Sequence, residues 1–246
     1  MNPSMDTPSD TDSLLAVLEK DEWFSSCAIE LKRALIRDAK MHDYAAGEAL
    51  YREGEFARHA LFCVIEGAVR LSSSLHDGTP SLLVYLEPCH WFGDISLIDG
   101  RPYIRDAIAD VDTRILCVPM QPFTQWLDHN PRHWRDIARL SINKLRVAYQ
   151  VIGEPGALHH RLARRLWLMA QGFGSRTQTP SLQLNVSQEH LAQMMGTTRQ
   201  SINAALARLE GLGLVVQGYR TIELRDLKSL LDHANRLDVE GPADRS

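Results

Sequence analysis

The segment that decides the fold is residues 186–206, VSQEHLAQMMGTTRQSINAAL, which predicts two short helices joined by a tight turn. Ser187 is expected to cap the first helix, because its hydroxyl can accept a hydrogen bond from an unpaired backbone N–H. Ala192 is small enough for a second helix to cross close above it, and Gly196 can supply the positive φ that the turn needs. One of the two threonines that follow would cap the second helix. This arrangement is typical of a helix-turn-helix, with an ordinary helical hairpin as the alternative.

The expected second helix has an apolar face and a polar face. Ile202, Leu206 and Leu209 recur at helical spacing on the apolar face, whereas Arg199 and Gln200 open the polar one. The first residues of a recognition helix contact base edges in the major groove, and Arg pairs well with guanine O6 and N7. The expected DNA-binding residues are Ser187, Gln188, Thr197, Thr198, Arg199, Gln200, Ser201, Asn203, Ala204, Arg208 and Arg220.

A short hairpin is predicted directly after the second helix. Residues 214–216 start a strand, and residues 221–224 return with alternating polarity after a Gly-containing turn at 217–220. A hairpin in this place is typical of a wing. Arg220, at or near its tip, would contact phosphate, or is a solvated surface charge.

The distribution of charge supports DNA as a partner, although the net charge of −4 and the pI near 6.2 do not. Residues 155–236 carry ten Lys or Arg residues against five Asp or Glu residues. The remainder of the chain carries 17 against 26. A basic domain joined to an acidic one is typical of a regulated nucleic-acid-binding protein.

The sequence argues against several other protein classes. No apolar run approaches the ~20 residues that span a bilayer, and the first twelve residues do not resemble a signal peptide. No metal triad, nucleophile elbow or phosphate-cradling glycine loop is present. The four cysteines form no CxxC pair. We therefore expect a cytoplasmic protein that is not an enzyme, holds no metal ion and makes no contact with a membrane.

The first half of the chain predicts a β-sandwich or β-barrel, because short apolar runs between residues 60 and 118 are separated by regularly spaced glycines. Helices are expected at 23–39, at 120–129, from Pro131 to about residue 152 and at 157–171. Residues 153–156, GEPG, would break the chain between domains. The fold class predicted is α+β.

The long helix carries two apolar rows, which suits a helix that packs on its own domain and on a second subunit. Burial within one subunit is the alternative. One row is Trp134, Ala138, Ser141, Leu145, Ala148 and Ile152, and the other is Ile137, Leu140, Lys144, Val147 and Val151. The expected dimer residues are Trp134, Ile137, Ala138, Ser141, Leu145, Ala148 and Ile152.

The order of these parts resembles the CRP/FNR superfamily of transcription regulators from about Trp23 to Leu231. Local matches are Tyr44-Ala45-Ala46-Gly47-Glu48, Ile65-Glu66-Gly67, Trp91-Phe92-Gly93-Asp94-Ile95-Ser96-Leu97 and Thr198-Arg199-Gln200-Ser201. The resemblance implies a disordered arm at 1–22, a cyclic-nucleotide-binding-like sensor domain at 23–130, a dimerisation helix at 131–153, a winged helix-turn-helix domain at 154–236 and a disordered tail at 237–246. It also implies a homodimer that binds a near-palindromic operator, and RNA polymerase as a partner.

The resemblance places an effector pocket at Gly93, Asp94, Ile95, Ser96, Tyr103, Ile104 and Arg105. Nucleotide-binding members hold ribose and cyclic phosphate with a Gly-Glu pair and an Arg-Ser pair, here Gly93-Asp94 and Tyr103-Ile104. Because a buried phosphate needs a paired cation, we expect poor binding of cyclic AMP, while Arg105 leaves another nucleotide open. An iron–sulfur cluster is disfavoured, since only Cys27 lies near the N-terminus. Haem stays an alternative through His42, His59, His76 and His90.

The recognition segment departs from the family pattern as well. Many members carry Arg-Glu and a second Arg four positions after the Glu, where this chain has Arg199, Gln200 and Ala204. Gln favours adenine where Glu accepts from cytosine, so the half-site is expected to differ at its inner positions. The predicted function is a homodimeric transcription regulator, and an activator because activation is the family's commoner mode. Its activity would be controlled by a signal sensed in the N-terminal sensor domain, which is expected to be a β-roll and is called the roll below. A constitutive regulator with a vestigial pocket is the main alternative, and a ligand-binding or catalytic protein on the same roll is a weaker one.

Overall fold

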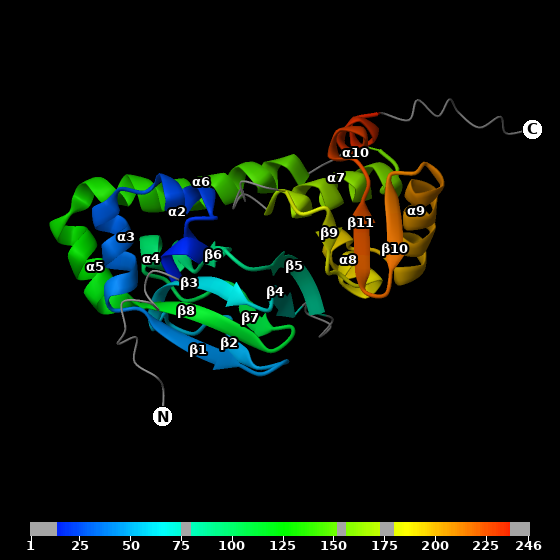
Figure 1. The fold of residues 1–246 in the computed structure, drawn as a ribbon. Helices are drawn as coiled ribbons and strands as arrows, with labels where there is room; N and C mark the ends of the chain where they lie inside the picture. The colour runs from blue at the N-terminus through cyan, green and yellow to red at the C-terminus, as the bar shows by residue number, and fades with distance from the viewer. Residues whose placement is uncertain (1–13, 75–79, 152–155, 173–179, 237–246) are drawn as a thin grey trace, which may run out of the picture. The chain divides into compact units, whose positions relative to one another are not determined.

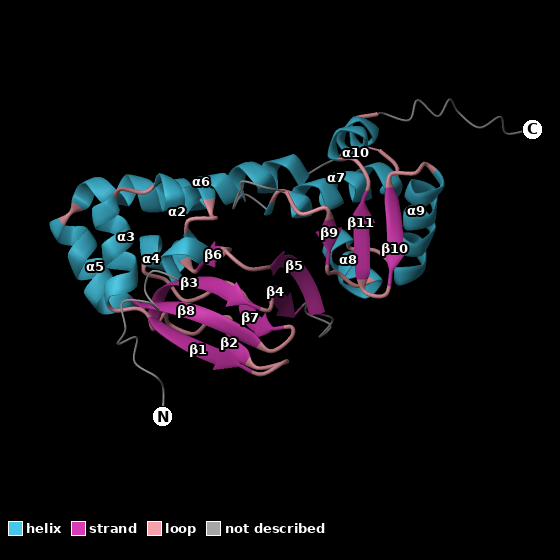
Figure 2. Cartoon of the chain, viewed as in Figure 1, coloured by secondary structure: helices cyan, strands magenta, loops and turns pink. Residues whose placement is uncertain are grey.

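The computed structural model describes residues 14–74, 80–151, 156–172 and 180–236. The chain forms two compact units, residues 1–146 with 174–179 and residues 147–173 with 180–246, here called unit 1 and unit 2. Figure 1 gives the element labels, and Figure 2 shows the strands of unit 1 gathered to one side of its helices. The α+β class predicted from the sequence is confirmed.

Unit 1 is built on two antiparallel four-stranded sheets. The first has the order β1-β8-β3-β6 and the second the order β2-β7-β4-β5. Their bounds are β1 (Lys40–Tyr44), β8 (Thr113–Pro119), β3 (His59–Glu66), β6 (Trp91–Phe92), β2 (Ala49–Tyr51), β7 (Asp106–Ala109), β4 (Val69–Ser74) and β5 (Pro80–Leu86). His76, one of the histidines considered for haem, lies outside the described residues.

The first sheet is buried on both faces, and the alternation of a strand divides its residues between two cores. Phe62 and Val64 of β3 face the interior of the roll with Ile115 and Cys117 of β8. Leu61, Cys63, Leu116 and Val118 face the helices instead. Near-continuous apolar runs in β3 and β8 follow from this double burial.

The helices of unit 1 are α2 (Glu22–Ser26), α3 (Ile29–Arg37), α4 (Asp94–Asp99), α5 (Met120–His129) and most of α6 (Trp134–Val151). A 3₁₀ turn at Pro131–His133 precedes α6, and the residues of α6 from Val147 on belong to unit 2. The single helix expected at 23–39 is therefore wrong. Cys27 and Ala28 are extended, with ψ of 148° at both. This break lets Trp23 and Phe24 join the same core as Leu31 and Leu35. Ile29, by contrast, is 53% exposed.

The disordered arm expected at 1–22 is wrong for residues 14–22, which are ordered. Residues 14–18 are helical. Leu14 and Leu18 are buried in the core between the first sheet and the helices, here called the helix-side core. Asp21 then caps α2, because its side chain accepts a hydrogen bond from the backbone N–H of Phe24 at 2.7 Å. The first 13 residues and the tail expected at 237–246 lie outside the described residues.

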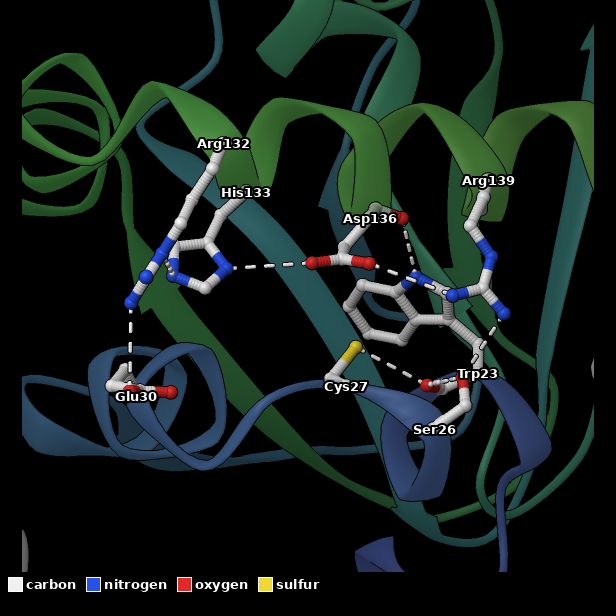
Figure 3. Close-up of polar contacts among 8 residues, drawn as sticks. All are labelled: Trp23, Ser26, Cys27, Glu30, Arg132, His133, Asp136 and Arg139. Atoms are coloured by element: carbon white, nitrogen blue, oxygen red, sulfur yellow. Dashed lines mark hydrogen bonds and ion pairs between the residues drawn. The ribbon is translucent and has the colours of Figure 1, made fainter.

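A polar network fixes the first turns of α6 to α2 and α3 (Figure 3). The indole N–H of Trp23 donates to the carbonyl of Asp136 at 2.6 Å, and the Arg139 guanidinium donates to Ser26 Oγ at 3.2 Å. The Asp136 carboxylate also contacts the buried ring of His133 at 3.3 Å. The start of α6 is therefore held by side-chain hydrogen bonds as well as by burial of Ile137 and Leu140.

Unit 2 combines helices with a three-stranded sheet of order β10-β11-β9. The bounds are α7 (Leu158–Ala170), β9 (Gln183–Leu184), α8 (Gln188–Met195), α9 (Arg199–Gly211), β10 (Val215–Gly218), β11 (Thr221–Leu224) and α10 (Leu227–Ala234). α10 packs on α7, and Asp226 caps it by accepting from Ser229 N–H at 2.8 Å. None of the described helices is both long and apolar enough to cross a membrane.

Candidate DNA interface and effector pocket

The helix-turn-helix predicted from the sequence is present, and its caps are those expected. Ser187 Oγ accepts from His190 N–H at 3.1 Å at the start of α8. Gly196 ends α8 with φ of 60°, a left-handed conformation that glycine adopts at no steric cost. Thr198 then caps α9, accepting from Ser201 N–H at 3.1 Å. These local choices fix where each helix begins and ends.

Helix α9 buries one face and exposes the other. Ile202, Leu206 and Leu209 are fully buried in unit 2, so the opposite face is left outward. The residues expected to contact DNA fall in two groups. The exposed group is Thr198, Arg199, Gln200, Asn203, Ala204, Arg208 and Arg220. The partly buried group is Ser187, Gln188, Thr197 and Ser201.

The wing is a hairpin of β10 and β11 with Tyr219 and Arg220 at its turn, since Gly218 pairs with Thr221. Tyr219 is 92% exposed. Arg220, the second central residue of the turn, has φ of 55°, a left-handed backbone conformation that a non-glycine residue adopts at some cost. The hairpin thus presents one exposed aromatic and one exposed cation at its tip.

A contact that the sequence did not predict joins the wing to α9. The Glu210 carboxylate accepts from the Gln217 backbone N–H and from its side-chain amide, both at 2.9 Å. These hydrogen bonds hold the pKa of the Glu210 carboxyl below its usual value. The Gln188 amide donates to Gln217 Oε1 at 3.3 Å. The start of α8, the end of α9 and the wing are therefore linked through one glutamine.

Two family models match the chain in the same order as its domains. The cyclic nucleotide-binding domain matches residues 41–130, and the Crp-like helix-turn-helix domain matches residues 160–233. The transcriptional regulator LdrP of Thermus thermophilus is 31% identical over 191 residues, which cover 77% of this chain and 94% of LdrP. The chain belongs to the CRP/FNR superfamily. It is accordingly a DNA-binding transcription regulator of the CRP type.

Other members of the superfamily agree with this assignment. The CRP-like cAMP-activated global transcriptional regulator of Mycobacterium tuberculosis is 26% identical over 199 residues, covering 74% of this chain and 86% of that protein. A crystal structure of a CRP/FNR-family transcriptional regulator from Thermus thermophilus matches with a TM-score of 0.60 at 26% identity, covering 80% of this chain and 99% of that one. FixK2 from Bradyrhizobium japonicum, at 24% identity and a TM-score of 0.68, supports the fold, covering 79% of this chain and 96% of that one.

The segment expected to form the effector pocket of this CRP/FNR regulator begins with Gly93, which has φ of 92° and precedes α4. The Asp94 side chain is nearly fully buried and already has two partners on α6. Ser141 Oγ donates to one carboxylate oxygen, and Lys144 Nζ forms an ion pair with the other. Asp94 is thus bound to α6 at the position where the family's Glu takes a ribose hydroxyl.

The two positions where nucleotide-binding members carry Arg-Ser are occupied differently. Tyr103 is buried, its ring stacks on Tyr51 at 3.7 Å between centroids, and its hydroxyl donates to the His59 carbonyl at 3.0 Å. Ile104 is 51% exposed. The Arg105 guanidinium donates to the Ile104 carbonyl at 2.7 Å. These residues do not fit a cyclic nucleotide phosphate, because neither expected position supplies a cation.

The residues expected at the dimer interface divide by position along α6. Ile137 is fully buried in unit 1, Trp134 packs partly against the same core, and Ser141 is engaged by Asp94. Ala138 and Ala148 are partly buried, Leu145 is 50% exposed, and Ile152 lies outside the described residues. Two exposed apolar residues were missed: Ile142 and Tyr149, at 47% and 68% exposure. Their heptad-like spacing from Ala138 and Leu145 was the signal available in the sequence.

Proposed function

We propose that the protein is a homodimeric transcription activator that binds a near-palindromic DNA site and contacts RNA polymerase. The observation that carries the DNA-binding mode is the exposed start of α9, where Arg199 and Gln200 stand outward above a fully buried apolar face. Side chains at these positions reach base edges when a recognition helix lies in the major groove. Arg220 at the wing tip supplies a phosphate contact that positions the helix.

The dimer is supported by an exposed apolar row on α6. Ala138, Ile142, Leu145 and Tyr149 follow spacings of four, three and four, which places them along one helix face. Three of these four side chains are large and between 47% and 68% exposed. A second copy of the same helix would cover them and give two reading heads related by a two-fold axis. The operator would then carry two half-sites about 34 Å apart.

The test of this proposal is selection of binding sites from random DNA, with Arg199→Ala as the variant. We expect the wild type to enrich a near-palindrome and Arg199→Ala to lose about 1–3 kcal/mol of base discrimination. Arg225→Ala is the charge-matched control, because Arg225 lies beyond the wing and pairs with Glu223 at 2.9 Å. Enrichment of a single asymmetric half-site, or equal selectivity in the two variants, would overturn the proposal.

Regulation by a signal in the roll is the second part of the proposal, following relatives such as the cAMP-activated regulator of Mycobacterium tuberculosis. A constitutive regulator is the other candidate, and the engaged state of Asp94 favours it. Lys144 and Ser141 each contact one carboxylate oxygen, so a nucleotide ribose would have to share a carboxylate that already holds an ion pair and a hydrogen bond.

Operator affinity measured on purified protein separates the two candidates. The protein is refolded or dialysed to remove small molecules, and the operator is titrated with and without cyclic AMP, cyclic GMP and cyclic dinucleotides. A regulated protein gains at least about fivefold in affinity with one of them. The constitutive candidate is supported if the protein binds its operator tightly and neither these compounds nor a cell extract changes the affinity.

A further inference from the structure

Two histidines and one cysteine converge inside the roll of unit 1. His42 on β1, His59 on β3 and Cys117 on β8 each place one ligand atom so that all three lie within 4.8 Å of one another. The strand order β1-β8-β3 brings these three strands side by side. No part of the proposed DNA-binding function uses these residues.

The sheet register explains why three residues so far apart in sequence share one face. Lys40 of β1 pairs with Cys117, so His42, two residues further on, points to the same side. On the other edge of β8, His59 pairs with Pro119, which has the same parity as Cys117. Cys117 packs in the core between the two sheets. The three side chains therefore meet on the interior face of the roll.

One ring nitrogen of each histidine lacks a hydrogen-bond partner among the described residues. These nitrogens are His42 Nε2 and His59 Nδ1, and both are buried. The two rings are 5.8 Å apart between centroids. Buried polar atoms are nearly always hydrogen bonded or bound to an ion or water. Two such nitrogens beside one thiol point to a ligand that accepts electron pairs from all three.

We infer that His42, His59 and Cys117 form a binding site for a borderline or soft transition-metal ion of the Zn²⁺ class. Imidazole nitrogen and thiolate sulfur are the donors that such ions prefer. Ligand atoms in a tetrahedral zinc site lie about 3.5 Å apart, as bond lengths of about 2.0–2.3 Å require, so the cluster reaches this geometry by small side-chain rotations. The sulfur binds as the thiolate, and the thiol proton passes to solvent.

Tyr44 completes the surroundings of the site. Its ring packs partly against the core that contains Cys117, and a hydroxyl donor turned toward the sulfur would stabilise a bound thiolate, as outer partners do in metal sites. With three protein ligands, the fourth position of a tetrahedral ion is left for water or another small ligand. The expectation from the sequence that no metal is held rested on the absence of closely spaced cysteines. Three ligands separated by 17 and 58 residues give no such pattern.

Cobalt spectroscopy on the full chain tests the site without reference to DNA binding. The reduced, chelator-treated protein is titrated with Co²⁺, and we expect one equivalent to produce a thiolate-to-cobalt charge-transfer band that one equivalent of Zn²⁺ removes. The band should vanish in Cys117→Ser and persist in Cys27→Ala, a buried cysteine in the helix-side core. His42→Gln and His59→Gln should weaken Co²⁺ binding by at least about tenfold.

The thiolate band also distinguishes this site from a second cluster in unit 2, formed by His159, His160 and His233. Co²⁺ bound there would give no such band, because that cluster contains no sulfur. Far-ultraviolet circular dichroism checks folding, and His42→Gln on the edge strand β1 decides the question if Cys117→Ser does not fold. A wild-type spectrum without the thiolate band, or a band retained in Cys117→Ser, would overturn the assignment. Either result leaves the DNA-binding proposal untouched.

Discussion

Replacing Lys144 by Met should destabilise unit 1 by about 2–4 kcal/mol. The Lys144 ammonium forms an ion pair with Asp94, whose side chain is 3% exposed, while the lysine itself is 29% exposed. Two unit charges about 3 Å apart attract by about 5 kcal/mol at an effective dielectric constant of 20. Removing one partner of a buried pair typically costs about 3–5 kcal/mol, because the other charge stays buried. The remaining hydrogen bond from Ser141 and the partial exposure of Lys144 reduce this loss.

Urea unfolding followed by tryptophan fluorescence measures the effect in the correct unit. Four tryptophans, Trp23, Trp91, Trp126 and Trp134, lie in unit 1, and Trp167 lies in unit 2. With an m-value of about 2 kcal/mol/M, the midpoint of the unit 1 transition should fall by about 1–2 M urea. The two units are analysed as separate transitions, since a two-unit chain does not unfold in one step.

Two further variants make the result specific to the pair. Arg146→Met removes an exposed cation from the same helix and should change stability by less than about 0.5 kcal/mol. Asp94→Asn combined with Lys144→Met should be much less destabilised than the sum of the single changes, with a coupling energy of at least about 1 kcal/mol. If Lys144→Met behaves like Arg146→Met, the ion pair does not stabilise unit 1 and the reasoning is refuted.

Three other outcomes follow from the structure. Leu145→Glu should convert the proposed dimer to a monomer in sedimentation experiments, whereas Gln150→Glu, the same charge change at an exposed position of α6, should not. Gly67→Ala should destabilise unit 1 by more than about 2 kcal/mol in urea unfolding, because the new Cβ would lie 2.5 Å from a backbone oxygen. In Gly54→Ala the new Cβ has open space, so unit 1 should lose only the ~1 kcal/mol of stability that an unfavourable positive φ costs. Unit 2 should lose stability as the pH falls from 6.5 toward 4, because burial lowers the pKa of His233 to about 4.

The sign of the last effect follows from proton linkage. Between pH 6.5 and about 4 the unfolded chain takes up a proton at His233 that the folded chain does not, so lowering the pH favours unfolding. The His233→Asn variant should flatten this slope. A flat wild-type profile, equal losses for the two glycine variants, or a dimer that survives Leu145→Glu would each contradict the corresponding argument.

Elements that depend on local chemistry were predictable from the sequence. Ser187, Gly196 and Thr198 act within three or four residues of themselves, through caps and a turn, and each does what its residue type favours. The apolar runs of β3 and β8 likewise identified buried strands before their partners were known. The wing followed from a glycine-containing turn between an apolar segment and an alternating one.

Features that depend on pairing between distant segments were not predictable. Lys144 interrupts an apolar row on α6, but nothing near it in sequence identified Asp94 as its partner. The break between α2 and α3 occurs at two residues without glycine or proline, because both helices gain burial in one core. The contact between Glu210 and Gln217 spans only seven residues, yet it requires the wing to fold back onto α9.

The doubled hydrogen bond from Gln217 to Glu210 also bears on which DNA sequences can be bound tightly. Since the wing is tied to the end of α9, the separation between the Tyr219–Arg220 turn and the start of α9 is set by the protein rather than adjusted on docking. The backbone of the DNA must then supply a phosphate at that separation from the bases being read. Sequences differ in groove width and in the energy needed to deform them. We therefore expect base pairs that no side chain touches to influence affinity through the width and deformability of the groove.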